Sequence, residues 1–144
     1  MLTLARILLT LTVLGYGFAT IKVDLNKTHA TNPTWTPHAR FHVVWQILSY
    51  TGIGVISLYL IWIAGATSIQ PLYLAAAISV AIYAGFFTAV FARTLFQGGL
   101  HDANGYPPYQ PPFGPKHWRW DANVTVFTGM SVILLAAIIV LIGH

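Results

Sequence analysis

The sequence predicts an all-α fold, an integral membrane four-helix bundle with two long loops on one membrane face. The first observation is composition, since 56% of the 144 residues are hydrophobic and only 7% are charged. In soluble domains about 25% of the residues are charged. The second is the presence of four apolar runs, each long enough to cross a bilayer as a helix of roughly 20 residues. The third is the position of the charged residues, which gather mainly in two of the segments between these runs.

The first helix is expected over residues 2–21. Arg6 precedes an apolar stretch that ends in the small residues Gly17 and Ala19, a pattern shared with secretory signal peptides. We expect this segment to remain as an uncleaved span. Residues 1–144 would then form a single domain with four transmembrane helices.

The second helix is expected over residues 37–64, with Thr36 as its N-cap and Pro37 in the first helical position, where a missing N–H costs nothing. From this start, His38, His42 and Gln46 fall on one stripe of the helix. Polar residues inside a membrane are costly and tend to mark functional sites. Ser57, in contrast, is expected only to hold helices together by hydrogen bonding.

The third helix is expected over residues 72–97 and the fourth over residues 121–142. Gly98 follows the third helix, and glycine is the usual residue for a helix C-cap. Asp121 suits the N-cap of the fourth helix, beside the positive end of its dipole. Arg93, in the last turns of the third helix, can extend to the lipid headgroups or anchor a substrate.

The basic residues predict how the chain lies in the membrane. With four spans, both termini lie on one side and the loops 22–40 and 93–123 lie on the other. Six of the seven basic residues lie in or beside those loops, so the positive-inside rule predicts cytoplasmic loops and external termini in a plasma (inner) membrane. The excess of basic residues thus reflects one membrane face, and we expect no nucleic-acid partner. These six residues are Lys22, Lys27, Arg40, Arg93, Lys116 and Arg119.

Five of the six histidines map to the same membrane face. His38 and His42 are four residues apart, which is the spacing of paired imidazole ligands on one helix. With His29 or another residue of this face as a third ligand, they would suit zinc, copper or non-haem iron. A transition-metal cofactor is therefore one interpretation. The five histidines are His29, His38, His42, His101 and His117.

The other interpretation needs no metal. Histidine titrates near neutral pH, so His29, His38 or His42 can act as a general acid or base. Asp24 would orient an imidazole, and Arg40 would position a polar substrate head. The remaining residues expected to bind the cofactor or substrate in this pocket are Asn32, Trp35, Gln46, Arg93, His101, Asp102 and His117.

Both interpretations describe a small membrane enzyme or ligand-binding protein that acts on a lipophilic molecule entering from the bilayer. The absence of cysteine excludes a thiolate nucleophile, a disulfide scaffold and an iron–sulfur cluster. The acidic residues stand in the patterns Asp24-x-Asn26, Asp102-x-Asn104 and Asp121-x-Asn123. These patterns are half of a calcium loop without its distal glutamate, so no calcium site is expected.

The second long loop suggests an alternative function. Residues 98–120 contain five of the eight prolines, with Tyr106, Tyr109 and Phe113 among them, which predicts a stiff, extended segment. Such a segment can cover a pocket mouth or dock a partner. The alternative is therefore an accessory subunit of a larger membrane complex, docking through residues 98–120.

One stretch carries a resemblance to a known family. Residues 28–42 read T-H-A-T-N-P-T-W-T-P-H-A-R-F-H, which resembles the signature of a family of small, uncharacterised four-helix membrane proteins, some labelled acetyltransferase-like. The resemblance covers about the first third of the chain and implies four spans without an activity. The architecture is also similar to that of the sterol-isomerase and sigma-2-receptor group. Those isomerases use acidic residues within their helices, and no residue here corresponds to them.

Overall fold

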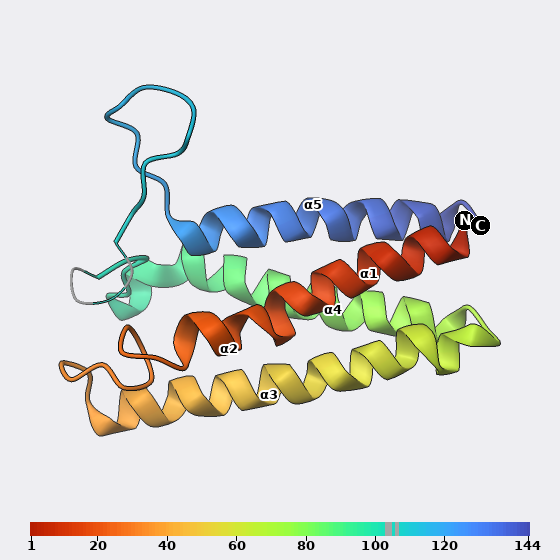
Figure 1. Cartoon of the computed structure of the whole chain (residues 1–144), viewed down its shortest axis with the longest axis horizontal. Helices are drawn as coiled ribbons and strands as arrows, with labels where there is room; N and C mark the ends of the chain where they lie inside the picture. The colour runs from red at the N-terminus through yellow and green to blue at the C-terminus, as the bar shows by residue number, and fades with distance from the viewer. Residues whose placement is uncertain (103–104, 106) are drawn as a thin grey trace.

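The computed structural model describes residues 1–102, 105 and 107–144, and within these residues the fold is all-helical (Figure 1). The prediction of an all-α fold is thereby confirmed. The long helices are separated by loops and by two short 3₁₀ turns, η1 and η2. The elements are α1 (Leu2–Gly17), α2 (Ala19–Asp24), α3 (Pro37–Trp62), η1 (Ala64–Ala66), α4 (Gln70–Ala92), η2 (Arg93–Phe96) and α5 (Ala122–Ile142).

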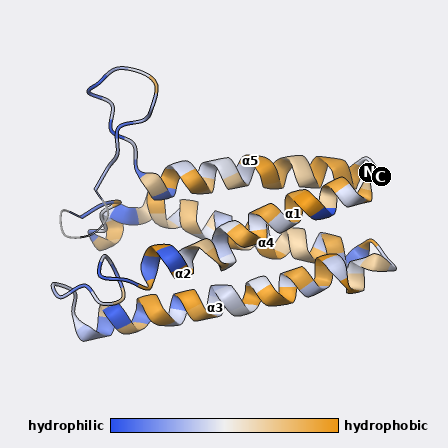
Figure 2. Ribbon diagram, viewed as in Figure 1, coloured by the Kyte–Doolittle hydropathy of each residue, from blue (hydrophilic) through white to orange (hydrophobic). Residues whose placement is uncertain are grey.

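Four helical segments of the described chain are long and apolar enough to cross a membrane. In the most apolar window of each segment, only 17% to 33% of the residues are buried inside the protein. Most of the apolar surface therefore faces outward, and lipid must cover it. Figure 2 shows that the long helices are mainly hydrophobic along their length. The protein is thus an integral membrane protein. The spans are Leu2–Asp24, Pro37–Ala66, Gln70–Phe96 and Ala122–Ile142.

The two long loops lie at one end of the bundle and both termini at the other (Figure 1). We call these the loop end and the terminal end. Helix α1 packs between α3 and α5, and α4 closes the bundle by contacting both of those helices. Each of the long helices α1, α3, α4 and α5 therefore contacts at least two of the others.

Helices α1 and α3 cross closely at two glycines. A Cβ atom added to Gly17 would lie 3.2 Å from Gly54 Cα, so the crossing leaves no room for a side chain. Polar bonds support the same seam, since Tyr16 donates from its hydroxyl to Ser57 Oγ at 3.0 Å. The prediction that Ser57 holds helices together is confirmed, as expected where small polar groups replace hydrophobic driving force.

The predicted starts of the second and fourth long helices are confirmed. Thr36 Oγ1 accepts the N–H of Ala39 at 3.2 Å, and Asp121 Oδ1 accepts the N–H of Val124 at 2.9 Å. The predicted glycine C-cap is wrong, because it is Gln97 that adopts the left-handed conformation, with φ of 55°. A 3₁₀ turn tightens the end of α4 first, which brings the left-handed position to Gln97.

The first span is broken at Phe18, where φ is −125° and ψ is −33°. The sequence predicts one continuous helix over residues 2–21, whereas the structure has α1, a break, and α2 as far as Asp24. Beyond the break, α2 packs against α3 and makes no close backbone contact with α5 among the described residues. The bundle therefore opens at its loop end.

Candidate functional site

A cavity of about 290 Å³ lies in this opening, between α2 and α3 on one side and α4 and α5 on the other. Its volume is near the lower limit for small-molecule sites, about 300–1,000 Å³. Most of the lining is apolar, and the polar groups come from a few residues. The lining residues are Gly15, Ala19, Thr20, Val23, Asp24, His29, Val43, Gln46, Tyr50, Phe86, Ala122, Asn123, Val126 and Phe127.

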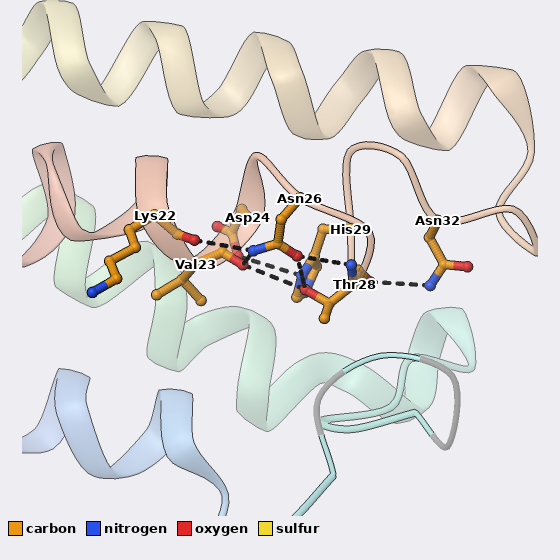
Figure 3. Close-up of polar contacts among 7 residues, drawn as sticks. All are labelled: Lys22, Val23, Asp24, Asn26, Thr28, His29 and Asn32. Carbon is orange, nitrogen blue, oxygen red and sulfur yellow. Dashed lines mark hydrogen bonds and ion pairs between the residues drawn. The ribbon is translucent and has the colours of Figure 1, made fainter.

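The polar end of the cavity is built by a turn that follows α2 (Figure 3). Asn26 Nδ2 donates to the backbone carbonyls of Lys22 at 3.0 Å and Val23 at 2.8 Å. Asn26 Oδ1 accepts the backbone N–H of Thr28 at 2.8 Å and the Thr28 hydroxyl at 2.7 Å. Backbone partners therefore fix which end of the Asn26 amide is the acceptor, and the side chain satisfies carbonyls that the end of α2 leaves unpaired.

The Thr28 hydroxyl is hydrogen-bonded to the neighbouring imidazole. Thr28 Oγ1 lies 2.8 Å from His29 Nδ1. When the one hydroxyl proton goes to Asn26 Oδ1 at 2.7 Å or to the Val23 carbonyl at 3.4 Å, neither of which can donate, Thr28 Oγ1 accepts from Nδ1–H. In this arrangement the proton of neutral His29 is on Nδ1, and Nε2 carries the lone pair.

Asp24 completes an acid–histidine pair at the cavity wall. Asp24 Oδ1 lies 3.6 Å from His29 Nδ1, and the side chains of His29 and Asp24 are 18% and 23% exposed. A carboxylate at this distance stabilises the positive charge that His29 acquires when Nε2 takes up a proton. The pair therefore has the parts of a general base with its orienting group.

Two further residues hold His29 in place. The ring of Trp35 packs edge-on against the imidazole, with centroids 5.2 Å apart. Asn32 is completely buried and donates from Nδ2 to the Thr28 carbonyl at 3.0 Å. Its Oδ1 accepts the N–H and the hydroxyl of Thr34 at 3.0 and 2.8 Å. The structure thus brings together Asp24, His29, Asn32 and Trp35, four of the residues that the sequence predicts for the site.

Helix α3 contributes Gln46, also a predicted site residue, together with Tyr50 one turn further along. Tyr50, Thr20 and Asn123 are polar lining residues that sequence reasoning missed. The spacing of four residues between Gln46 and Tyr50 was the available signal. No comparable signal points to Asn123. It lies in the first turn of α5, and the N-cap role of Asp121 is enough to explain the Asp-x-Asn pattern there.

The other predicted residues of α3 lie elsewhere. His38 and His42 are exposed, with their Nε2 atoms 3.0 Å apart, and neither lines the cavity. Arg40, in the first turn of α3, is also outside the lining. His29 therefore does not join His38 and His42, and no group of three or more histidine or acidic side chains suited to a metal ion occurs among the described residues.

The described part of residues 98–120 contributes no lining residue of the cavity. Arg93 borders a smaller neighbouring cavity of about 190 Å³ and donates from Nη1 to the Val90 carbonyl at 2.6 Å. His101 lies in a groove along α5, and Asp102 and His117 are exposed. Asn104 and Tyr106 of the sequence patterns fall outside the described residues.

The site therefore consists of the Asp24–His29 pair, its supporting turn, and a mostly apolar cavity at the loop end of the membrane-spanning helices. The resemblance of residues 28–42 to a family signature stays a prediction. Comparison with protein-family models, with curated proteins and with solved structures finds no match for this chain.

Proposed function

We propose that the protein binds a lipophilic molecule from the bilayer in the cavity and that His29 exchanges a proton with the polar group of that molecule. The observation that carries the proposal is the Asp24–His29 pair, 3.6 Å apart, at the wall of a mostly apolar cavity. Titratable residues that are largely buried beside an apolar cavity tend to mark functional sites. The same arrangement serves an enzyme or a binding protein.

The chemistry follows from the tautomer of His29. Its Nε2 lone pair can accept a proton from a hydroxyl or an activated C–H of the bound molecule, while the carboxylate of Asp24 stabilises the resulting imidazolium. Gln46 and Asn123 supply amide donors and acceptors that can orient the polar group. The apolar walls exclude water and strengthen these interactions.

The size of the cavity limits the ligand. At about 290 Å³, the cavity holds a small ring system or the polar end of a longer lipid, whose chains would remain in the bilayer. Phe86, Val126 and Phe127 provide the apolar contacts. The ligand class is therefore a lipophilic molecule with one hydroxyl, carbonyl or similar group.

Ligand extraction tests this proposal. The full-length protein is purified, and the molecules that leave it in organic solvent are identified by mass spectrometry. Ala19→Phe places a ring in the cavity and should remove the bound molecule, whereas Ala84→Phe, on an exposed part of α4, should retain it. Identical extracts from the wild type and both variants would overturn the proposal.

Once the ligand is known, His29→Gln separates the two kinds of protein. The variant keeps a polar side chain of similar reach but has no basic nitrogen. If the protein is an enzyme, His29→Gln should bind the ligand and turn it over at least about 100-fold more slowly. A wild-type protein that leaves the ligand unchanged is a binding protein.

Metal binding at His38 and His42 is a second candidate, favoured by the 3.0 Å separation of their Nε2 atoms. Two imidazoles this close can hold one zinc, copper or iron ion, with the remaining positions filled from outside the chain. Elemental analysis of the wild type, His38→Ala and His42→Ala tests it. Stoichiometric metal that either substitution removes would support this candidate, and a metal content equal in all three proteins would exclude it.

A further inference from the structure

Residues 107–120, called the hairpin below, stand away from the bundle at the loop end. Tyr109 and Trp120 pair through two backbone hydrogen bonds of 2.9 Å, and Gly114 adopts φ of 91° near the tip. Figure 1 shows the hairpin extending sideways from the loop end of the bundle, on the side of α5. Because the helices cross the bilayer, this direction lies along the membrane surface, over the lipids next to α5.

The exposed side chains of the hairpin include aromatic and basic ones. Phe113 is 60% exposed and Trp118 is 40% exposed. Trp118 stacks on Trp120 with centroids 6.2 Å apart, and Phe113 packs edge-on against Trp120 at 5.3 Å. Residues 107–120 include Lys116 and Arg119 and no acidic residue. Aromatic rings favour the headgroup region, and basic side chains there attract anionic lipids.

The Arg119 guanidinium is oriented by the hairpin itself. Its Nη1 donates to the backbone carbonyls of Lys116 at 2.9 Å and Trp118 at 2.8 Å. A guanidinium has five N–H donors, so the three on Nε and Nη2 point away from these carbonyls. Phosphate oxygens match such a fixed, planar donor group.

A groove of about 560 Å³ runs from the hairpin along α5. His101 and Arg119 border the groove, and Val124 and Thr128 continue it along the first turns of α5. Asp121 also borders it, but its carboxylate accepts the N–H of Val124 at the helix N-terminus. The groove thus offers a basic group at headgroup level and a path for an acyl chain into the bilayer.

We propose that the hairpin and this groove bind an anionic phospholipid of the surrounding leaflet. The phosphate lies against Arg119 and Lys116, and one acyl chain follows α5 past Thr128. The exposed rings of Phe113 and Trp118 lie among the neighbouring headgroups. This site shares no lining residue with the cavity at Asp24 and His29, so the proposal does not rest on the ligand of that cavity.

Native mass spectrometry of the full-length protein in detergent tests the proposal, with titration of phosphatidylglycerol or phosphatidylcholine. Each basic residue near a membrane surface contributes about 1 kcal/mol, or about fivefold in affinity. Lys116→Gln combined with Arg119→Gln should therefore weaken phosphatidylglycerol binding about 25-fold, and phosphatidylcholine binding by a smaller factor, because the choline cation offsets the charge of its phosphate. Lys22→Gln combined with Lys27→Gln, at exposed lysines of the same membrane face, is the matched control and should change neither.

Three outcomes would overturn the proposal. If both double variants lost phosphatidylglycerol affinity equally, the lipid would be attracted to the basic membrane face in general and not to the hairpin. Displacement of phosphatidylglycerol by excess inorganic phosphate would mean a site for a soluble anion. A stoichiometric protein that copurifies with the wild type and is lost from the hairpin variant would make the hairpin a docking surface for a subunit. Circular dichroism checks that the variants are folded. If the double variant unfolds, Lys116→Gln alone replaces it, and its phosphatidylglycerol affinity should fall about fivefold.

Discussion

At the scale of single residues, the turn from Asp24 to His29 places both the Thr28 hydroxyl and the Asp24 carboxylate next to His29 Nδ1. Asp24 and His29 were predictable as site residues, because an acid and a histidine meet where a helix leaves the membrane. The role of Asn26 and Thr28 could not be predicted, because it depends on turn geometry that residue types alone do not specify. The same limit applies to His38 and His42. A spacing of four residues fixes how two side chains lie relative to each other, not which neighbour they face.

The first prediction concerns Asn26. In Asn26→Ala the Thr28 hydroxyl loses its nearest acceptor and can donate to His29 Nδ1 instead, which would move the histidine proton to Nε2. The ring ¹⁵N chemical shifts of His29 report this change directly. We also expect a loss of about 1–3 kcal/mol in stability, because carbonyls at the end of α2 lose their donor.

Asn26→Asp is the matched control for the tautomer. It keeps an acceptor oxygen for Thr28, so the Nδ1–H form should persist although the two carbonyl contacts are lost. Identical ¹⁵N shifts in Asn26→Ala and the wild type would show that Asn26 does not set the tautomer.

At the scale of elements, the break at Phe18 creates the cavity. The N–H of Ile21 bonds to the Phe18 carbonyl at 3.2 Å, three residues back, and the Gly17 carbonyl is instead 2.9 Å from the Thr51 hydroxyl. Thr51 shares its proton between this carbonyl and that of Ile47 at 2.8 Å. A side chain of α3 thus satisfies the backbone group that the break exposes, a known cause of irregular helices. Hydropathy cannot predict it, because residues 2–21 form one apolar run without proline.

The second prediction concerns the crossing of α1 and α3 beside this break. In Gly17→Ala the new methyl group would lie 3.2 Å from Gly54 Cα and 3.3 Å from the Tyr50 carbonyl. Such overpacking against backbone should cost about 1–3 kcal/mol. Gly52→Ala is the matched control, because its Cβ meets nothing within 4 Å, and it should gain about 0.5–1 kcal/mol as a helical alanine. Unfolding by SDS in mild detergent measures both free energies. If Gly17→Ala and Gly52→Ala were equally stable, α1 and α3 could move apart at the crossing without a cost in stability.

At the scale of the whole molecule, the bilayer explains why the fold was predictable. The width of the hydrocarbon core sets the length of each helix, so four apolar runs were enough to predict a four-span bundle. The positions of loop residues within one membrane face were not predictable. His101 and His117 share that face with His29, but hydropathy does not specify the direction of a loop, and the hairpin carries His117 away from the cavity.

The third prediction concerns the orientation of the bundle in its membrane. Because the chain has no cysteine, single cysteines can be introduced and labelled without background. The basic residues predict that the loop end faces the cytoplasm. In right-side-out vesicles, a membrane-impermeant maleimide should therefore label Ser68→Cys, in the turn between α3 and α4, and not Gln110→Cys, in the hairpin. Both residues are exposed, so both variants should react after the membrane is permeabilised, which controls for reactivity. Labelling of Gln110→Cys alone would reverse the orientation and place the hairpin and the Asp24–His29 site on the external face.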